Sequence, residues 1–576
     1  MSFGEKANFI WNVADLLRGN FKQGEYGRVI LPFTVLRRFD CVLAPFKEKI
    51  LGLNKTLTVS NKKPVFKKFT GCDYYNISRF DFPKLLDDSN AIETNLRDYI
   101  NGFSDDVREI LDNFEFGTVI ERLKKANLLY LIIQKFSEIN LSVNSVDNQE
   151  MGYMFEELIR RFSEQSNETA GEHFTPREVI ELMVDLLLCP DMDEMTKDGI
   201  VKTIYDPACG TGGMLSIAQN KMEEMNTKTV IIPFGQELNP ETFAICKSDM
   251  ILKGNANSKI VLGNSFSEDG FRGQYFDYML SNPPFGVEWK NVEKFIKDEA
   301  ETQGFNGRFG AGTPRISDGS LLFLQHMLSK MNPPDKGGSR IGIVFNGSPL
   351  FTGDAGSGES EIRKWIIEND LLEAVIALPD QLFYNTGIYT YIWILTNRKA
   401  KRRKGKIRLV NGVSYFEKMR KSLGNKRNLI DEKNRCEIAK LYSMYKPNEN
   451  YKDFNNEDFG YYKITVERPL RSENGKIVLD KNEEPKADSA LRDTENVPIV
   501  RGEDQAVTIN SYFKSEVQPH VPDAWVDETK TRIGYEIPFT RHFYKFTPLR
   551  SSKEIIGEIK KLETKIDKGL LEVFGK

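Results

Sequence analysis

Cysteine and histidine are scarce in this chain of 576 residues, which contains six Cys and four His. The cysteines form no CxxC pair and the histidines are dispersed, so we predict neither a disulfide framework nor a metal site. No uncharged apolar stretch approaches the roughly 18–20 residues that span a bilayer. The first residues also lack the basic-then-apolar order of a signal peptide. We therefore expect a reduced, cytoplasmic protein with no membrane partner.

An excess of charge of one sign is also missing, since 80 basic residues oppose 83 acidic ones for a net charge of −3. Apolar residues at 40% and charged residues at 28% are typical of a soluble globular protein, which excludes a disordered or fibrous chain. The near-neutral balance does not favour a nucleic-acid partner, whose phosphates are contacted by Lys and Arg. One segment, residues 398–406, is nevertheless strongly basic. It suits either a solvated turn after a strand or a phosphate contact.

Hydrophobic periodicity divides the chain into regions. Residues 1–145 are predicted to form an N-terminal helical domain, because apolar residues recur three or four apart. The polar stretch Ser142–Asn148 marks its end. We expect residues 401–547 to form a mixed region of unclear role and residues 548–576 to form a C-terminal helix. Ser551 or Ser552 would cap that helix, whose apolar stripe suits its own domain or a partner helix.

Between residues 150 and 400, short apolar runs alternate with helical segments, which is typical of βαβ units in a mostly parallel α/β sheet. The last two runs are separated by only about ten residues, so a hairpin with one antiparallel strand is expected there. Seven strands ending in a hairpin suit a Rossmann-like methyltransferase sheet better than a six-stranded dehydrogenase sheet. The runs are Thr203–Tyr205, Thr229–Phe234, Lys259–Leu262, Phe276–Leu280, Arg340–Phe345, Ala374–Leu378 and Tyr389–Leu395.

A glycine-rich turn follows the first of these strands, and its sequence from Asp206 to Gly213 is DPACGTGG. Glycines let the backbone approach a ligand closely. The GxGxxG pattern and the Lys-Ser/Thr of a phosphate-binding loop are both absent. The turn therefore suits a nucleoside with a cationic tail, S-adenosylmethionine, although a tight turn without a ligand has the same pattern. The candidate cofactor-binding residues here are Asp206, Gly210, Thr211, Gly212 and Gly213.

A carboxylate follows the second strand at Glu237, about one βα unit after the glycine turn. An acidic side chain at this position accepts hydrogen bonds from both ribose hydroxyls of a nucleoside. The alternative is an ordinary surface glutamate.

The tetrapeptide Asn282-Pro283-Pro284-Phe285 follows the fourth strand and is the candidate catalytic element. An exocyclic adenine amine is a poor nucleophile, because its lone pair is delocalised into the ring. Two acceptors, the Asn282 side-chain oxygen and the Pro283 carbonyl, would favour a more pyramidal nitrogen, and proline helps to hold that carbonyl in place. Phe285 offers a face for an extruded base. The alternative is a strand terminator with an aromatic plug.

These motifs together resemble the amino-group DNA methyltransferases. Upstream, residues 172–177 (EHFTPR) are similar to an element of the modification subunits of type I restriction–modification systems. In that family this element contacts S-adenosylmethionine, and a residue corresponding to Asn264 meets the adenine ring of the cofactor. Taken alone, Thr175 would also cap a helix whose first residue is Pro176. The resemblance assigns cofactor contacts to Glu172, His173, Phe174, Thr175, Pro176, Arg177 and Asn264.

The resemblance also implies partners. The family acts on double-stranded DNA, with two methylase subunits for each specificity subunit and a restriction subunit in the full complex. The terminal helix would then dock on the specificity subunit. Alternatives are a methyltransferase for another planar amine, such as guanine N2 of ribosomal RNA or a protein glutamine, and a scaffold subunit without turnover.

Two further segments are open at this point. A Gly- and Arg-bearing stretch between Phe305 and Asp318 could be a lid in which Arg308 and Arg315 contact DNA, or an ordinary loop. Residues 471–522 match no element of the family and have no predicted role.

Overall fold

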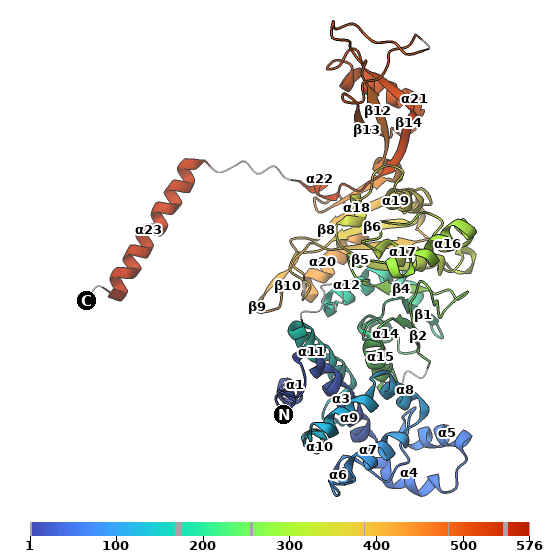
Figure 1. Ribbon diagram of the computed structural model, residues 1–576, viewed down its shortest axis with the longest axis vertical. Helices are drawn as coiled ribbons and strands as arrows, with labels where there is room; N and C mark the ends of the chain where they lie inside the picture. Colours follow the sequence, from blue (N-terminus) through green and yellow to red (C-terminus); the bar gives the residue numbers. More distant parts are fainter. Residues whose placement is uncertain are drawn as a thin grey trace. The chain divides into compact units, whose positions relative to one another are not determined.

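The computed structural model describes residues 3–166, 175–253, 257–384, 386–481, 483–544 and 551–574 (Figure 1). The chain divides into two compact units, Met1–Ile537 and Pro538–Lys576. No helix in the described ranges is long and apolar enough to cross a membrane. The domain boundaries that we expect at residues 145, 400 and 547 stay predictions.

The N-terminal region is helical, as expected. Its central helix, α3, is buried along most of its length. Arg38 on α3 is fully buried and donates hydrogen bonds to the Val146 carbonyl (2.6 Å) and the Asn148 side chain (2.7 Å). A buried guanidinium needs such acceptors, so Arg38 connects the helical core to the segment that precedes α11. The helices are α1 (Phe3–Asn12), α2 (Ala14–Leu17), α3 (Tyr26–Leu43), α4 (Lys47–Asn54), α5 (Val59–Thr70), α6 (Phe82–Leu85), α7 (Ile92–Asn101), α8 (Asp105–Asn113), α9 (Phe116–Lys125), α10 (Leu129–Ser137) and α11 (Asn148–Ser166).

A mostly parallel sheet follows, in the order β11-β8-β6-β7-β5-β4-β1-β2-β3. All seven predicted strands are present, and β7 runs antiparallel to both β5 and β6, as the short hairpin connection predicts. The predicted α/β class is therefore confirmed, and two further strands, β8 and β11, extend the sheet beyond β6. The strands are β1 (Val201–Asp206), β2 (Val230–Glu237), β3 (Lys259–Leu262), β4 (Tyr278–Ser281), β5 (Arg340–Phe345), β6 (Leu372–Ala377), β7 (Tyr391–Thr396), β8 (Lys406–Asn411) and β11 (Tyr451–Asn455).

Helices pack on both faces of this sheet. Ile204 of β1 belongs to the core shared with α12, α14 and α20, whereas its neighbour Tyr205 donates or accepts a hydrogen bond with His326 of α17 (2.9 Å). Since successive side chains of a strand point to opposite faces, α17 lies on the other face. Helix α15 joins the sheet to the helical region, because Ala244 and Ile245 belong to the helical core. The helices are α12 (Arg177–Leu188), α13 (Met192–Met195), α14 (Gly213–Met225), α15 (Pro240–Leu252), α16 (Glu293–Gln303), α17 (Ser320–Ser329), α18 (Ser348–Phe351), α19 (Gly358–Glu368) and α20 (Glu432–Ser443).

The basic segment at residues 398–406 is partly internal. Arg398 forms a bidentate pair with Asp191 (2.9 and 2.7 Å), and Lys399 contacts Asp370 (2.6 Å). Arg403 is buried against Tyr442 of α20. These three cations connect the turn after β7 to neighbouring elements, so neither a solvated turn nor a phosphate contact describes them.

The remaining part of the larger unit contains a two-stranded sheet, β10-β9, and a small antiparallel sheet in the order β13-β12-β14, with its own core around Ile464 and Val497. Residues 471–522, which had no predicted role, contribute β13 and α21 to it. Helix α23 of the smaller unit is the expected C-terminal helix, and Ser551 caps it by accepting the Glu554 N–H (3.3 Å). The elements are β9 (Glu417–Leu423), β10 (Lys426–Leu429), β12 (Gly460–Glu467), β13 (Asp493–Pro498), α21 (Gln505–Tyr512), β14 (Trp525–Tyr535), α22 (Phe539–Phe543) and α23 (Ser552–Phe574).

Candidate active site

Three predicted motifs meet at the carboxyl edge of the sheet, because β1, β2 and β4 are parallel neighbours. Asp206 ends β1, and its Oδ1 accepts a hydrogen bond from the Ser281 hydroxyl at the end of β4 (2.8 Å). Glu237 ends β2, and its Oε2 accepts the Gly210 N–H (2.8 Å). The glycine turn is therefore hydrogen-bonded to the carboxylate of Glu237 at the end of β2. Strand β1, which carries the turn, is hydrogen-bonded through Asp206 to Ser281, the residue before Asn282.

The glycine turn needs glycine for steric reasons. Gly212 has φ +81°, and a Cβ at this position would lie 2.6 Å from the Cys246 sulfur of α15. Gly210 also has a positive φ, +53°. Side chains at either position would strain the backbone. The turn thus brings bare backbone to the start of α14, which begins at Gly213.

Glu237 uses both carboxylate oxygens on the backbone, since its Oε1 also accepts the Asn239 N–H (2.8 Å). The carboxylate is therefore oriented by two backbone N–H groups, one from the glycine turn and one from the segment after β2. Asp206 is almost fully buried, and this burial raises the pKa of its carboxyl group to about 7; the nearby charge of Glu237 adds to the shift.

Asn282 carries the most informative atom of the site. Its side-chain Oδ1 is buried and has no hydrogen-bond partner among the residues that the structure describes. A buried acceptor without a partner costs roughly 1–3 kcal/mol. Pro283 is buried, and Phe285 packs against the core cluster of the sheet. The Asn282 oxygen is therefore an acceptor to which none of the described residues donates.

The segment before α12 differs in detail from the expectation. Glu172, His173 and Phe174 lie outside the described residues. The prediction that Thr175 caps a helix starting at Pro176 is wrong: α12 begins at Arg177, Pro176 is its cap residue, and no side chain bonds the cap. The reason is that the Pro176 carbonyl already accepts the first helical N–H groups, from Val179 and Ile180.

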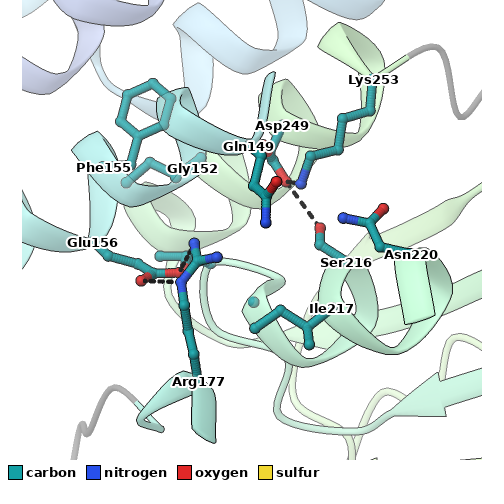
Figure 2. Close-up of a pocket in the computed structure, with 13 residues that line it drawn as sticks. Gln149, Gly152, Phe155, Glu156, Arg177, Ser216, Ile217, Asn220, Asp249 and Lys253 are labelled. Carbon is teal, nitrogen blue, oxygen red and sulfur yellow. Dashed lines mark hydrogen bonds and ion pairs between the residues drawn. The ribbon is translucent and has the colours of Figure 1, made fainter. Parts of the chain in front are cut away.

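Arg177 borders a hollow of about 420 Å³, partly open to solvent, next to the glycine turn (Figure 2). Its guanidinium pairs with Glu156 of α11 (3.0 and 3.2 Å) and lies over the Tyr153 ring. Burial and the charge of Asp249 raise the pKa of Glu156 to about 8, and the charge of Lys253 acts in the opposite direction. The Arg177–Glu156 pair therefore joins the predicted cofactor segment at residues 172–177 to α11 of the N-terminal helical region.

The far wall of the hollow comes from α14 and α15. Asp249 accepts hydrogen bonds from the Ser216 hydroxyl (2.9 Å) and the Lys253 amine (2.5 Å), as Figure 2 shows. Thr211 and Gly213 of the glycine turn also line the hollow, but Glu237 and Asn282 do not. Sequence reasoning missed Glu156 and Asp249, because both lie on amphipathic helices whose polar residues read as solvated.

Asn264 follows β3, but its side-chain oxygen is used locally, accepting the Phe266 N–H (2.9 Å). Its contact with the cofactor stays a prediction, as do the roles of the other candidate site residues. What the structure establishes is the proximity of the turn after β1, the end of β2 and the end of β4, which are joined by the Gly210–Glu237 and Ser281–Asp206 hydrogen bonds.

The two arginines of the 305–318 segment have different environments. Arg308 is paired with Glu299 (2.6 Å) and donates to the Ser265 and Phe266 carbonyls (2.8 and 2.6 Å), so it is a structural residue. The Arg315 side chain is 46% exposed, and its ion pair with Asp318 is long, at 3.9 Å. Of the pair, Arg315 alone keeps its guanidinium accessible to a phosphate.

Comparison with known proteins agrees with this arrangement. Residues 146–476 match the model of the N-6 DNA Methylase family, and residues 6–136 match that of the HsdM N-terminal domain. The type I restriction enzyme MjaIX methylase subunit of Methanocaldococcus jannaschii is 26% identical over 497 residues, which cover 80% of this chain and 81% of that protein. The HindI methylase subunit of Haemophilus influenzae is 29% identical over 273 residues, 46% of this chain and 55% of that one.

Among solved structures, the methyltransferase subunit of a type I restriction–modification system from Streptococcus thermophilus has a similar fold. Its TM-score is 0.61 at 20% identity, with 80% of this chain and 97% of that chain covered. Because the first family model covers more than half of the sequence, the chain belongs to the N-6 DNA methylase family, the S-adenosylmethionine-dependent enzymes that methylate N6 of adenine in DNA.

Proposed function

We propose that this chain is the methylase subunit of a type I restriction–modification complex, and that Asn282 and Pro283 hold the amine of an adenine extruded from duplex DNA. The observation that carries the proposal is the buried Oδ1 of Asn282, which has no hydrogen-bond partner in the described part of the chain. This residue follows Ser281, whose hydroxyl bonds Asp206 at the start of the glycine turn. The acceptor is thus held beside the edge that would bind the cofactor.

The residues at this edge fit S-adenosylmethionine, which when bound supplies an electrophilic methyl group on a sulfonium. Gly210 to Gly213 would lie against it without side chains in the way. Glu237, oriented by two backbone N–H groups, would accept its ribose hydroxyls. Asp206, Asn264 and residues 172–177 would complete the contacts.

The chemistry of the proposed amine site follows from its acceptors. Asn282 Oδ1 and the Pro283 carbonyl would each accept one N–H of the adenine amine, which favours a pyramidal nitrogen with a more available lone pair. Phe285 would stack on the base and limit its rotation. Holding the nitrogen in line with the methyl group would supply most of the rate acceleration, because orientation converts an encounter into an intramolecular step.

The proposed partners are double-stranded DNA, a specificity subunit and a restriction subunit, with two methylase subunits for each specificity subunit. Relatives of this chain are named as methylase subunits of type I restriction enzymes. Helix α23 supports a docking role, since an amphipathic helix ordinarily buries its apolar stripe. Here that stripe is exposed: Ile555 39%, Ile559 50%, Leu562 58%, Ile566 59% and Leu570 50%.

The catalytic proposal is tested by producing the chain with its specificity subunit and measuring transfer of a labelled methyl group to DNA and to RNA. We expect N6-methyladenine at one DNA sequence, mapped by long-read sequencing, and no transfer to RNA. The Asn282→Ala complex should assemble normally and transfer no methyl group. Continued turnover by that complex would exclude the assigned site. Normal methylation of host DNA in cells whose only copy of the chain carries Asn282→Ala would favour the scaffold role.

The docking proposal is tested on the helix itself. Leu562→Asp with Ile566→Asp places charges on the stripe and should abolish co-purification with the specificity subunit. Thr564→Asp introduces the same residue on the opposite side of the helix, because positions two apart are separated by about 200°. This control should leave the complex intact. Equal loss in both variants would mean that the helix is not the docking surface.

A further inference from the structure

A row of exposed apolar side chains lies at the same sheet edge as Asn282. Phe351 at the end of α18 is 59% exposed, and Ile388 and Tyr389 in the β6–β7 connection are 47% and 48% exposed. We call these three residues the apolar rim. A single exposed apolar residue is ordinary on a protein surface. Three large exposed apolar side chains at the same sheet edge as a proposed DNA site are evidence that this surface contacts DNA.

The rim is two strands away from the proposed catalytic residue. Strands β4 and β5 are parallel neighbours, with Ser281 opposite Ile343, and β5 ends two residues later. Tyr391 at the start of β7 pairs with Phe345, the last residue of β5. Neighbouring strands lie about 4.8 Å apart, so the rim and Asn282 lie at the same edge of the sheet, about two strand spacings apart.

Phe351 and the strand that follows the tip of the β6–β7 connection both lie next to Gly347. A Cβ at Gly347 would lie 3.7 Å from the Tyr391 ring and 3.9 Å from the Phe351 ring. Tyr389 precedes Tyr391, the first residue of β7, by two residues. The backbone behind the tip is anchored, since the Leu378 N–H donates to the Thr390 carbonyl (2.9 Å). Tyr389 is therefore an exposed ring on a fixed support.

Extruding a base from a duplex leaves a gap in the stack and costs a few kcal/mol of stacking and pairing. Proteins that distort DNA often insert apolar side chains into such gaps. An aromatic ring is well suited, because stacking of a base on an aromatic side chain contributes roughly 1–3 kcal/mol.

We propose that the apolar rim faces the target duplex and that the Tyr389 ring enters the space left by the extruded adenine, keeping the base outside the helix. This inference rests on the proposed function, because it assumes that DNA enters at the Asn282 edge. It adds a positioning residue that acts on the DNA and not on the methyl group.

The experiment uses the complex with the specificity subunit and two DNA duplexes, one fully paired and one with an abasic position opposite the target adenine. The second duplex has already lost the pairing that extrusion must break. Tyr389→Ala should reduce single-turnover methylation of the paired duplex about tenfold to hundredfold, the range that stacking energies imply. On the abasic duplex, the variant should stay within about threefold of the unmodified complex.

A second readout is independent of chemistry. With 2-aminopurine at the target position, extrusion increases fluorescence, and the increase should be weaker for Tyr389→Ala and preserved for Tyr389→Phe, which keeps the ring. Tyr275→Ala is the matched control, because Tyr275 is 52% exposed but precedes β4 at the opposite edge of the sheet. It should behave as the unmodified complex does.

Three outcomes would overturn the inference: unchanged methylation of the paired duplex by Tyr389→Ala, an equal loss on both duplexes, or loss of the specificity subunit from the variant complex. Loss of the specificity subunit would mean that the rim contacts that subunit and not the DNA. Failure of the proposed function is distinguishable, because then the unmodified complex would neither methylate DNA nor increase the fluorescence of 2-aminopurine. Cofactor affinity measured by calorimetry, expected to be unchanged, controls for folding.

Discussion

Replacing Asn282 with alanine should greatly slow methyl transfer and leave the free energy of unfolding nearly unchanged. The side-chain oxygen is buried without a hydrogen-bond partner in the described parts of the chain, so its removal breaks no hydrogen bond there. An unsatisfied buried acceptor costs roughly 1–3 kcal/mol, and deleting it offsets the packing lost with the amide. We therefore expect the free energy of unfolding to change by about 1 kcal/mol or less.

The effect on methyl transfer should be much larger. Removing one hydrogen-bonding group that acts on a developing transition state typically lowers the rate by about 10²–10³-fold, or about 2.7–4 kcal/mol. The Pro283 carbonyl would remain and account for the residual rate. Asn282→Asp keeps an acceptor oxygen at the same place and should retain more activity than Asn282→Ala.

The assay is single-turnover methyl transfer by the complex at saturating cofactor and DNA, combined with urea unfolding of the chain. Asn76→Ala is a suitable control, because this buried amide donates to the Tyr99 carbonyl (2.9 Å) and accepts the Ser78 N–H (2.8 Å) within the N-terminal helical region. It should destabilise the protein and leave the rate constant unchanged. The reasoning is refuted if Asn282→Ala unfolds more easily by over about 2 kcal/mol, or if its rate stays within about tenfold of the unmodified enzyme.

Other predictions concern the surrounding residues. Glu237→Gln should weaken cofactor binding about tenfold or more in calorimetry, because it removes a charge-assisted acceptor, and DNA affinity should not change. Burial raises the pKa of Asp206 above its unfolded value, so its contribution favours folding at low pH and is lost as the pH rises through about 7. In urea unfolding, the unmodified protein should therefore lose about 2 kcal/mol more of its free energy of unfolding between about pH 5.5 and pH 8 than the Asp206→Asn variant loses. Arg308→Ala should cost about 3–5 kcal/mol of stability, because it leaves buried Glu299 unpaired. Arg315→Ala should change stability by under about 0.5 kcal/mol and reduce the salt dependence of DNA binding by about one charge.

Some features were predictable because their signals are local. A run of apolar residues such as Arg340–Phe345 forms a strand wherever both faces are covered, and the glycines of the 206–213 turn indicate a backbone that other residues cannot adopt. The capping serine of α23 was predictable for the same reason. Strands β8 and β11 were not, since β8 begins inside the basic segment and β11 is an edge strand with exposed Lys452 and Asp453.

Other features depend on partners that are distant in the sequence. Arg308 and Arg315 look alike in the chain, but one is neutralised by Glu299 and the other is exposed. Glu156 reads as a solvated helix residue until Arg177 is placed beside it. Whether a charge is internal or accessible is decided by the elements packed around it, and periodicity cannot reveal them.

By itself, the sequence determined the α/β class, the seven central strand segments along the chain and the identity of the motifs that follow them, because these depend on periodicity and on residue types within one turn. Only the tertiary structure decided that the Asn282 oxygen has no partner among the described residues, that Arg308 is structural and that Tyr389 is exposed at the same edge of the sheet. The physical reason is that burial and hydrogen-bond satisfaction are properties of a packed environment, to which residues far apart in the chain contribute.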